Sequence, residues 1–358
     1  MEMPQSRSPH RMVAAVPLYF EAQMRVSILI VTFNSREVIK ECIESLLSQT
    51  HKDVEILLYD NASSDDTVEI IKSSYGNRVR IVEGRYNRGF GYGLNRLAEI
   101  ASGEVLASLN PDTITDKEWI SSAISHFEQS DVGMVAPKIL FRDRPDTIDS
   151  TGHLIYPDGL NRGRGHNKKD GSAFSSPNEV AFPSGSAGFY RRDLYLKLGG
   201  IDESLFLFGD DTDIGLKFQL SGYRCIYEPS SIVYHNYSSS TGRYSDLKAY
   251  FVERNRIHIL LKYFPAHLIP LSIFHTIKRF LFHNYSAISG RGNTAEYLKE
   301  GSVFRLYTLM LIAYSDVLLD IKDVMKKRNE IKKTIDKNRI GRLLREFRIS
   351  AREITLTE

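Results

Sequence analysis

Asp112 is a candidate metal ligand, because it follows a stretch of apolar residues and a proline. The tetrapeptide Asn110-Pro111-Asp112-Thr113 comes directly after the apolar run Val105–Leu109. A carboxylate at the end of a buried strand suits Mg²⁺ or Mn²⁺, since such hard cations take one or two carboxylates and leave their other positions to water and substrate phosphates. The alternative is a purely structural turn, which the tetrapeptide taken alone favours.

A second candidate is a cluster of acids, Asp210, Asp211 and Asp213, at the start of an expected helix. Acids are favoured in the first turn of a helix because the helix dipole is positive there. Capping accounts for one or two of the three acids, but it does not require all of them. The cluster therefore indicates a carboxylate that could act as a general base toward a hydroxyl group.

His235 is the third candidate, at the end of the apolar run 232–234. A neutral imidazole can ligate a metal ion. A single histidine at the end of a strand is more often structural, so His235 alone favours the structural interpretation.

The elements that must position these side chains alternate between strands and helices. Strands are predicted over Val26–Thr32, 54–59, 79–82 and 105–109, and helices over 36–49, 67–74 and 92–101. The continuous apolar runs are typical of parallel strands buried on both faces. This order predicts an α/β fold with a mostly parallel sheet and flanking helices. Ligands bind such sheets beyond the carboxyl ends of the strands, where Thr32-Phe33-Asn34, Asp60-Asn61 and Asn110-Pro111-Asp112 stand.

The rest of the chain has a different pattern. Residues 141–182 are rich in Gly, Asp, Arg and Asn, which predicts long loops with a few strands that face the substrate. From about residue 245 the chain is expected to be helical to its end.

Length and composition exclude several classes of protein. The 358 residues are 42% hydrophobic and 25% charged, which indicates one large or two smaller globular domains and excludes a collagen-like, disordered or disulfide-scaffold protein. The two cysteines, Cys42 and Cys225, are expected to be buried thiols in a reducing compartment. No segment reaches the roughly 20 apolar residues that span a bilayer.

The chain as a whole resembles the family 2 glycosyltransferases with the GT-A fold, in particular their rhamnosyltransferase-like branch. The resemblance covers residues 25–263 and rests on several motifs in a fixed order. These are Val31-Thr-Phe-Asn-Ser35, Tyr59-Asp-Asn-Ala-Ser-Ser-Asp-Asp-Thr67, Asn87-Arg-Gly-Phe-Gly-Tyr-Gly-Leu-Asn95, Leu109-Asn-Pro-Asp-Thr113, Arg191-Arg192 with Gly199-Gly-Ile-Asp-Glu203, Gly209-Asp-Asp-Thr-Asp213 and His235. Each motif is weak by itself, and the ordered set is specific.

The resemblance implies a role for each matching residue. The nucleotide-sugar site would comprise Thr32, Phe33, Asn34, Asp60, Asn87, Gly89, Asn95, Asn110 and Asp112. Asp112 and His235 would contact Mg²⁺ or Mn²⁺ on the diphosphate. Asp211 would be the general base, within a catalytic motif that also includes Asp210 and Asp213.

Three positions depart from the family pattern. Asn110 replaces the first acid of the metal motif, so metal binding would rest on Asp112 and His235. Asp210 replaces the usual glutamate. Lys217 stands where many members have arginine, which puts a bidentate clamp at that position in doubt.

The implied function is an inverting, metal-dependent transfer of a sugar from a nucleotide-diphosphate donor, dTDP-rhamnose or a UDP-sugar. The acceptor would be a hydroxyl of a glycan or lipid-linked molecule in cell-envelope polysaccharide synthesis. The alternatives are a non-catalytic sugar-nucleotide-binding or scaffold protein and a nucleotidyltransferase. A dinucleotide-dependent dehydrogenase is disfavoured. Its G-x-G-x-x-G motif would need a glycine at position 94, which is Leu94, and the glycines at 89–93 follow the third strand instead of the first.

The expected organisation is an extension at 1–24, a catalytic domain at 25–245 and a helical region at 246–358. The catalytic domain would comprise a nucleotide-sugar half (25–115) and an acceptor half (116–245). Residues 322–352 carry twelve Lys and Arg against four Asp and Glu, a net charge of +8. Such basic helices beside apolar segments predict a peripheral contact with the cytoplasmic face of a membrane. A soluble bundle or an oligomerisation element is the alternative, and no nucleic-acid partner is expected.

Overall fold

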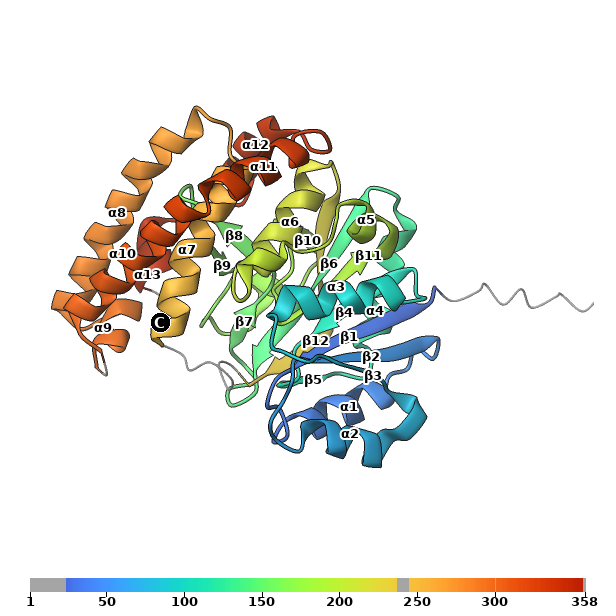
Figure 1. Cartoon of the computed structure of the whole chain (residues 1–358). Coiled ribbons are helices and arrows are strands. Elements are labelled where there is room, and N and C mark those ends of the chain that lie inside the picture. The colour runs from blue at the N-terminus through green and yellow to red at the C-terminus, as the bar shows by residue number, and fades with distance from the viewer. Residues whose placement is uncertain (1–23, 237–244, 300, 357–358) are drawn as a thin grey trace, which may run out of the picture.

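The computed structural model describes residues 24–236, 245–299 and 301–356. One ten-stranded sheet runs through the centre of the molecule (Figure 1). Its strands are β1 (Val26–Thr32), β2 (Val54–Asp60), β3 (Arg80–Glu83), β4 (Val105–Leu109), β5 (Thr113–Thr115), β6 (Val132–Phe141), β7 (Ile148–Ser150), β10 (Asn178–Val180), β11 (Ala187–Arg191) and β12 (Arg224–His235). A separate hairpin consists of β8 (His153–Ile155) and β9 (Asn161–Gly163).

The sheet order is β10-β12-β6-β11-β4-β1-β2-β3, with β5 paired to β12 and β7 paired to β6. The neighbours β4, β1, β2 and β3 are parallel, as are β6 and β12. The antiparallel strand β11 joins these two groups. The mostly parallel sheet with flanking helices predicted from the sequence is confirmed.

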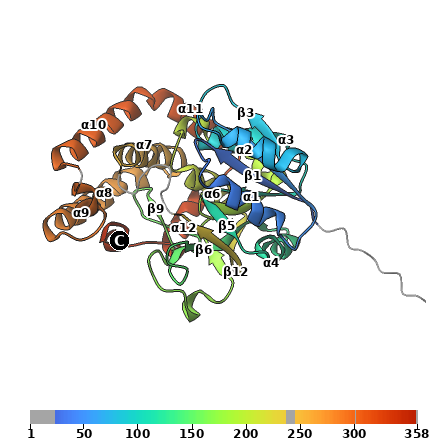
Figure 2. The same ribbon diagram turned by 90° about the horizontal axis from the view of Figure 1, so that it is seen from below.

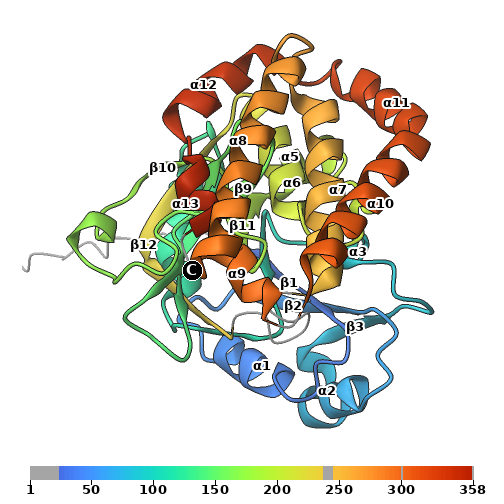
Figure 3. The same ribbon diagram turned by 90° about the vertical axis from the view of Figure 1, so that its left-hand side faces the viewer.

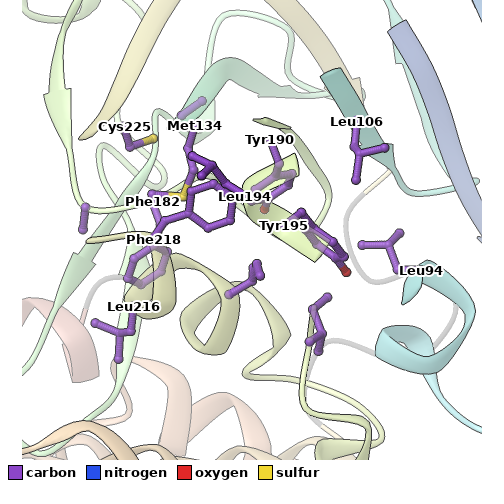
Figure 4. Close-up of a cluster of buried hydrophobic side chains, with 14 of the residues drawn as sticks. Leu94, Leu106, Met134, Phe182, Tyr190, Leu194, Tyr195, Leu216, Phe218 and Cys225 are labelled. Carbon is purple, nitrogen blue, oxygen red and sulfur yellow. The ribbon is translucent and has the colours of Figure 1, made fainter. Parts of the chain in front are cut away.

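Helices cover both faces of the sheet. They are α1 (Ile39–Leu47), α2 (Thr67–Tyr75), α3 (Phe90–Ile100), α4 (Trp119–Ile124), α5 (Arg192–Lys197) and α6 (Asp210–Leu220). Side chains along β1 alternate between the faces. Ile28 and Ile30 pack with α1, α2 and α4, whereas Leu29 and Val31 belong to a cluster with α3, α5 and α6. Figure 4 shows part of that second cluster, including Tyr190, Tyr195 and Phe218.

The carboxy-terminal part is helical, as predicted. Its helices are α7 (Asp246–Tyr263), α8 (Leu268–Ser289), α9 (Asn293–Leu298), α10 (Val303–Leu319), α11 (Ile321–Ile331), α12 (Ile340–Glu346) and α13 (Ala351–Leu356). Residues of α7 and α12 join the same buried cluster as α3 and α6. Figure 2 shows α8, α9 and α10 beside the sheet, on the side away from β3. Among the helices that the structure describes, none combines the length and apolarity needed to cross a bilayer.

Most of the predicted elements agree with the structure to within three residues. Helix α1 is shorter than the predicted 36–49, because a turn closed by Ser35 precedes it. Residues 141–182 form loops with the short strands β7 to β10, as expected. Both cysteines are buried free thiols. The predicted extension at 1–24 lies almost entirely outside the described residues.

Candidate active site

Strand register brings Asp112 and His235 together. Asp112 directly precedes β5, and the first residue of β5, Thr113, is paired with His235 at the end of β12. The backbone N–H of Asn236 donates to the carbonyl of Asp112 at 2.9 Å, which closes the same ladder. As a result, Nε2 of His235 lies 3.5 Å from Oδ1 of Asp112, and both side chains are buried. Two residues more than 120 positions apart are thus neighbours.

Asp149, on β7, orients the imidazole from its other side. Its Oδ2 lies 2.7 Å from Nδ1 of His235, and its Oδ1 lies 3.1 Å from Nδ1 of His166. Burial opposes the charged form of Asp149, but the hydrogen bonds with His166 and His235 hold its pKa well below the usual range. Likewise, burial opposes the imidazolium of His235, but Asp112 and Asp149 raise its pKa to about 10. The arrangement fixes the ring with Nε2 toward Asp112.

Asp211 lies in the first turn of α6, where the left-handed Gly209 precedes the helix. Asn161 of β9 donates from Nδ2 to Oδ1 of Asp211 at 3.1 Å, and the backbone N–H of Gly185 donates to Oδ2 at 3.3 Å. Nε2 of His153 lies 3.6 Å from Oδ2. The His153 ring is itself held by stacking on Phe182. The carboxylate of Asp211 is therefore fixed by residues of the 141–185 segment.

Two short segments connect the Asp112–His235 pair to Asp211. Asp149 contacts His235, and four residues later His153 faces Asp211. The turn at 184–186 makes the second connection: Gly185 donates to Asp211, while the backbone carbonyl of Ser186 accepts from Asn110 at 2.9 Å. The predicted metal ligands and the predicted base therefore border the same segments of chain.

The other two acids of the cluster occupy different surroundings from Asp211. Burial and the neighbouring carboxylate of Asp211 raise the pKa of Asp210 to about 7. Asp213 is fully buried, and its Oδ1 accepts from Lys262 at 2.5 Å and from Tyr263 at 2.6 Å, both on α7. Its other oxygen lies 3.3 Å from Nζ of Lys217. Asp213 therefore links α6 to α7, and the side chain of Lys217 pairs with Asp213 in the same buried cluster.

The end of β1 and the turn after β2 hold each other in place. Asp60 accepts from the hydroxyl of Thr32 at 2.9 Å and from the backbone N–H of Ser63 at 2.8 Å. Asn34, in a left-handed conformation, accepts from the backbone N–H of Ser64 at 2.8 Å. Phe33 is exposed between them. These residues lie together at the carboxyl ends of β1 and β2, as the sequence predicts.

A glycine joins this region to the segment before α6. Asn87 accepts from the backbone N–H of Gly89, and Asn61 donates to the carbonyl of Gly89 at 3.1 Å. Gly89 has φ of +88°, and a Cβ there would lie 2.1 Å from the carbonyl oxygen of Phe206. Only glycine therefore allows this close approach.

Asn95 and a group of polar residues on α7 serve packing. The amide of Asn95 bonds to Ile201 and Tyr195, which ties α3 to α5 and to the segment after it. Asn255 donates to the carbonyls of Leu205, Leu207 and Phe208. The flanking Arg254 and Arg256 pair with Asp320 and Glu253.

The Asp112–His235 pair fits a divalent cation in donor chemistry. A carboxylate oxygen and an imidazole nitrogen face each other, and Asp149 supports the imidazole as metal-bound histidines require. A cation bound by both residues would displace the proton that Nε2 of His235 carries in its absence. Within the described ranges, no group of three or more His, Cys, Asp and Glu side chains is arranged to hold a metal ion. Mg²⁺ is commonly bound by two protein ligands, while substrate diphosphate and water complete its coordination shell.

Sequence reasoning missed Asp149, His153, Asn161 and His166. All four lie in the polar segment 141–182, whose residues show no helical or strand period. The available signal was the spacing of an acid and an imidazole in Asp149-Ser-Thr-Gly-His153.

Comparisons with known proteins point to glycosyltransferases. Residues 27–199 match the family model "Glycosyl transferase family 2". The N-acetylglucosaminyl-diphospho-decaprenol L-rhamnosyltransferase of Mycobacterium tuberculosis is 28% identical over 240 residues, which cover 60% of this chain and 77% of the relative. The UDP-Glc:alpha-D-GlcNAc-diphosphoundecaprenol beta-1,3-glucosyltransferase WfaP of Escherichia coli is 34% identical over 141 residues, 38% of this chain and 54% of the relative. The matches span only 25%, 18% and 54% of the first three curated relatives.

Solved structures support the fold assignment. GalNAc-T7, solved with UDP, GalNAc and Mn²⁺, superposes with a TM-score of 0.58 at 16% identity over 85% of this chain and 58% of that one. Staphylococcus aureus TarS 1–349 in complex with UDP-GlcNAc superposes with a TM-score of 0.54 at 16% identity. The match covers 90% of this chain and 91% of TarS 1–349. The fold is GT-A-like, with a helical carboxy-terminal region.

Proposed function

We propose that the chain, whose residues 27–199 match the family model "Glycosyl transferase family 2", transfers a sugar from a nucleotide-diphosphate donor to a hydroxyl group in cell-envelope polysaccharide synthesis. The observation that carries the proposal is the connection of the Asp112–His235 pair to Asp211 through residues 149–153. Transfer from a nucleotide sugar requires a site for the diphosphate and a base for the acceptor, and these two groups supply them.

Asp211 acts as the base. As the acceptor oxygen bonds to the anomeric carbon, its proton passes to the carboxylate of Asp211, and the bond between that carbon and the diphosphate oxygen breaks on the opposite side. A single displacement of this kind inverts the anomeric configuration. Asn161 and the N–H of Gly185 orient the carboxylate, because they donate to its two oxygens.

Asp112 and His235 would hold Mg²⁺ or Mn²⁺ against the diphosphate. A bound cation supplies neutralisation of the charge that develops on the leaving group. Asp149 keeps Nε2 of His235 directed toward Asp112. GalNAc-T7, which shares the fold, was solved with Mn²⁺ and UDP, and this supports the choice of cofactor.

Two relatives support a lipid-linked acceptor, because their names specify diphospho-decaprenol and diphosphoundecaprenol acceptors. One relative is named a rhamnosyltransferase and the other uses UDP-Glc, so dTDP-rhamnose and UDP-glucose are the donors to test first. We propose residues 25–245 as the catalytic domain and 246–358 as a helical region at the cytoplasmic face of the membrane. Thr32, Phe33, Asn34, Asp60, Asn87 and Gly89 would form the nucleotide side of the site.

A donor panel tests the proposal. Purified chain is incubated with UDP-, dTDP- and GDP-sugars and Mn²⁺, and release of nucleoside diphosphate is followed with and without a polyprenyl-diphosphate sugar acceptor. We expect slow release from one donor, faster release with the right acceptor, and a loss of both on adding a chelator. Asp112→Ala should weaken metal-supported donor binding, whereas the exposed Asp66→Ala should not.

Two outcomes would contradict the proposal and indicate another function. Donor binding without turnover across the panel would indicate a sugar-nucleotide-binding scaffold. Pyrophosphate release from a nucleoside triphosphate would indicate a nucleotidyltransferase.

A further inference from the structure

Helix α8 has its polar and apolar faces reversed relative to a solvated helix. The side chains that it exposes include Phe274 (70% exposed), Ile277 (52%), Leu281 (64%) and Ile288 (88%). Their spacing of three, four and seven residues places them on one face of the helix. Scattered exposed apolar residues are ordinary, but a continuous apolar face of this kind marks an interaction surface.

The opposite face of α8 carries its buried polar groups. Arg279 is 3% exposed, and it donates to Asp158 at 2.7 Å and to both carboxylate oxygens of Glu253 at 3.0 Å. Ser272 and Ser286, one heptad before and after it, are buried too. Ion pairs hold this face of the helix to the protein, together with packing of Leu268, Ile269 and Phe282, and the exposed apolar residues of the helix are left for something outside the chain.

Helix α10 extends this surface. Phe304 is 83% exposed and Leu311 is 66% exposed. The hydroxyl of Tyr307 on α10 donates to Asn284 of α8 at 2.9 Å, so the outer surfaces of the two helices adjoin. Figure 3 shows α8 and α10 on the side of the molecule that faces the viewer, with α7 between them over much of their length. We call Phe274, Ile277, Leu281, Ile288, Phe304 and Leu311 the apolar face.

The charges around the apolar face favour an anionic lipid surface over a second copy of the chain. Helix α8 contains no acidic residue from Leu268 to Ser289. Lys278, Arg291 and Lys322 are exposed on or beside the two helices. Cations next to apolar side chains complement a bilayer, whose anionic headgroups lie directly above its hydrocarbon. Two copies meeting through this face would bring like charges together.

We propose that the apolar face lies on the surface of an anionic bilayer, with α8 and α10 in the plane of the interface. The basic segment 322–352 is also expected from the sequence to contribute to this contact. It packs on the protein where Lys327 pairs with Asp202 at 2.6 Å and the N–H of Ile349 donates to the carbonyl of Ile155, while cations such as Lys322 and Lys326 are exposed. The proposal rests on the membrane location proposed above for residues 246–358 and names the surface that makes the contact. It is independent of sugar transfer, since membrane contact requires neither donor nor metal.

Vesicle flotation of the full chain tests the proposal. With vesicles of equal phosphatidylglycerol and phosphatidylcholine, the wild type should float, and it should bind phosphatidylcholine alone more weakly. The double variant Phe274→Glu/Leu281→Glu should reduce the apparent partition constant for vesicles at least about tenfold. The charged side chains would then stand at the two positions that enter the bilayer. Leu196→Glu, at a 37% exposed leucine of α5, is the matched control and should float like the wild type.

A second, milder variant distinguishes a loss of vesicle binding from a failure to fold. The chain has one tryptophan, Trp119, which is fully buried. In Phe274→Trp the added fluorophore should shift to the blue when anionic vesicles are added, and brominated lipid should quench it. No flotation of the wild type, or no shift in Phe274→Trp, would overturn the proposal. A dimer in light scattering that Phe274→Glu/Leu281→Glu dissociates, without vesicle binding, would assign the face to a second copy. Asp211→Asn should float normally, which separates this test from that of transfer.

Discussion

Asp149 and His153 lie four residues apart, and each contacts a different part of the site. Oδ2 of Asp149 lies 2.7 Å from Nδ1 of His235, while Nε2 of His153 lies 3.6 Å from Oδ2 of Asp211. One short segment therefore supports both the imidazole proposed to hold a metal and the carboxylate proposed to accept a proton. A displacement of this segment would disturb donor binding and proton transfer together.

Asp149→Asn should weaken Mn²⁺ binding by about 10–100-fold, as substitutions of groups that support metal-bound histidines do. The amide cannot give the imidazole the negative partner that orients it. Calorimetric titration of Mn²⁺ in the presence of nucleoside diphosphate measures the effect. Asp146→Asn, at an exposed acid of the same loop, is the control. Equal Mn²⁺ affinity in both variants would remove Asp149 from the support of His235.

Asp211→Asn should lower the rate of transfer by at least about 100-fold, the usual contribution of a general base. The affinity for the donor should stay within about threefold of the wild type, because Asp211 faces the acceptor in this account. Single-turnover transfer and calorimetry of donor binding separate the two quantities. Transfer at a comparable rate in this variant would show that another group takes the proton.

Asp213→Asn should affect stability and leave the chemistry largely intact. The substitution leaves the ammonium of Lys262 buried with one carboxylate fewer, and breaking a buried ion pair costs about 3–5 kcal/mol. Urea unfolding measures the loss, and kcat is compared at a temperature where the variant is folded. A normal unfolding free energy with a large loss of kcat would place Asp213 in the catalytic machinery instead.

His283 should make the protein less stable in mild acid. Burial and the cation of Arg279 lower its pKa to about 3. The unfolded chain takes up a proton near pH 6.5 and the folded chain does not, so the free energy of unfolding falls as the pH drops below about 6.5. Between pH 7 and pH 5 this histidine alone should cost about 2 kcal/mol.

Urea unfolding of His283→Gln at both pH values checks this prediction. The pH-dependent loss in the variant should be smaller than in the wild type by that amount. The exposed His267→Gln should retain the wild-type loss. An equal loss in all three proteins would mean that His283 is protonated in the folded state.

The strands were predictable because continuous apolar runs mark them. All seven residues of Val26–Thr32 are buried, and polar groups follow where parallel strands end. The approach of Asp112 to His235 depends on the pairing of β5 with β12, a long-range register that no local pattern encodes. The resemblance suggested that these residues act together, and only the fold supplies the reason.

The remaining site residues depend on burial and tertiary packing. Asp211 and Asp213 are two residues apart on one helix, yet one faces His153 and the other faces Lys262. Composition does not distinguish them, because the difference arises from α7 packing against α6. Asn161 and His153 were missed for a related reason, since a short hairpin in a polar segment carries no periodicity.

Anomalous diffraction at the manganese edge, from crystals grown with Mn²⁺ and a nucleotide sugar that the donor panel selects, tests the central claim most directly. The account predicts a manganese peak within bonding distance of both Asp112 and His235, with the anomeric carbon of the donor on the side of Asp211. A peak away from both residues, or a diphosphate bound without contact to either, would contradict it.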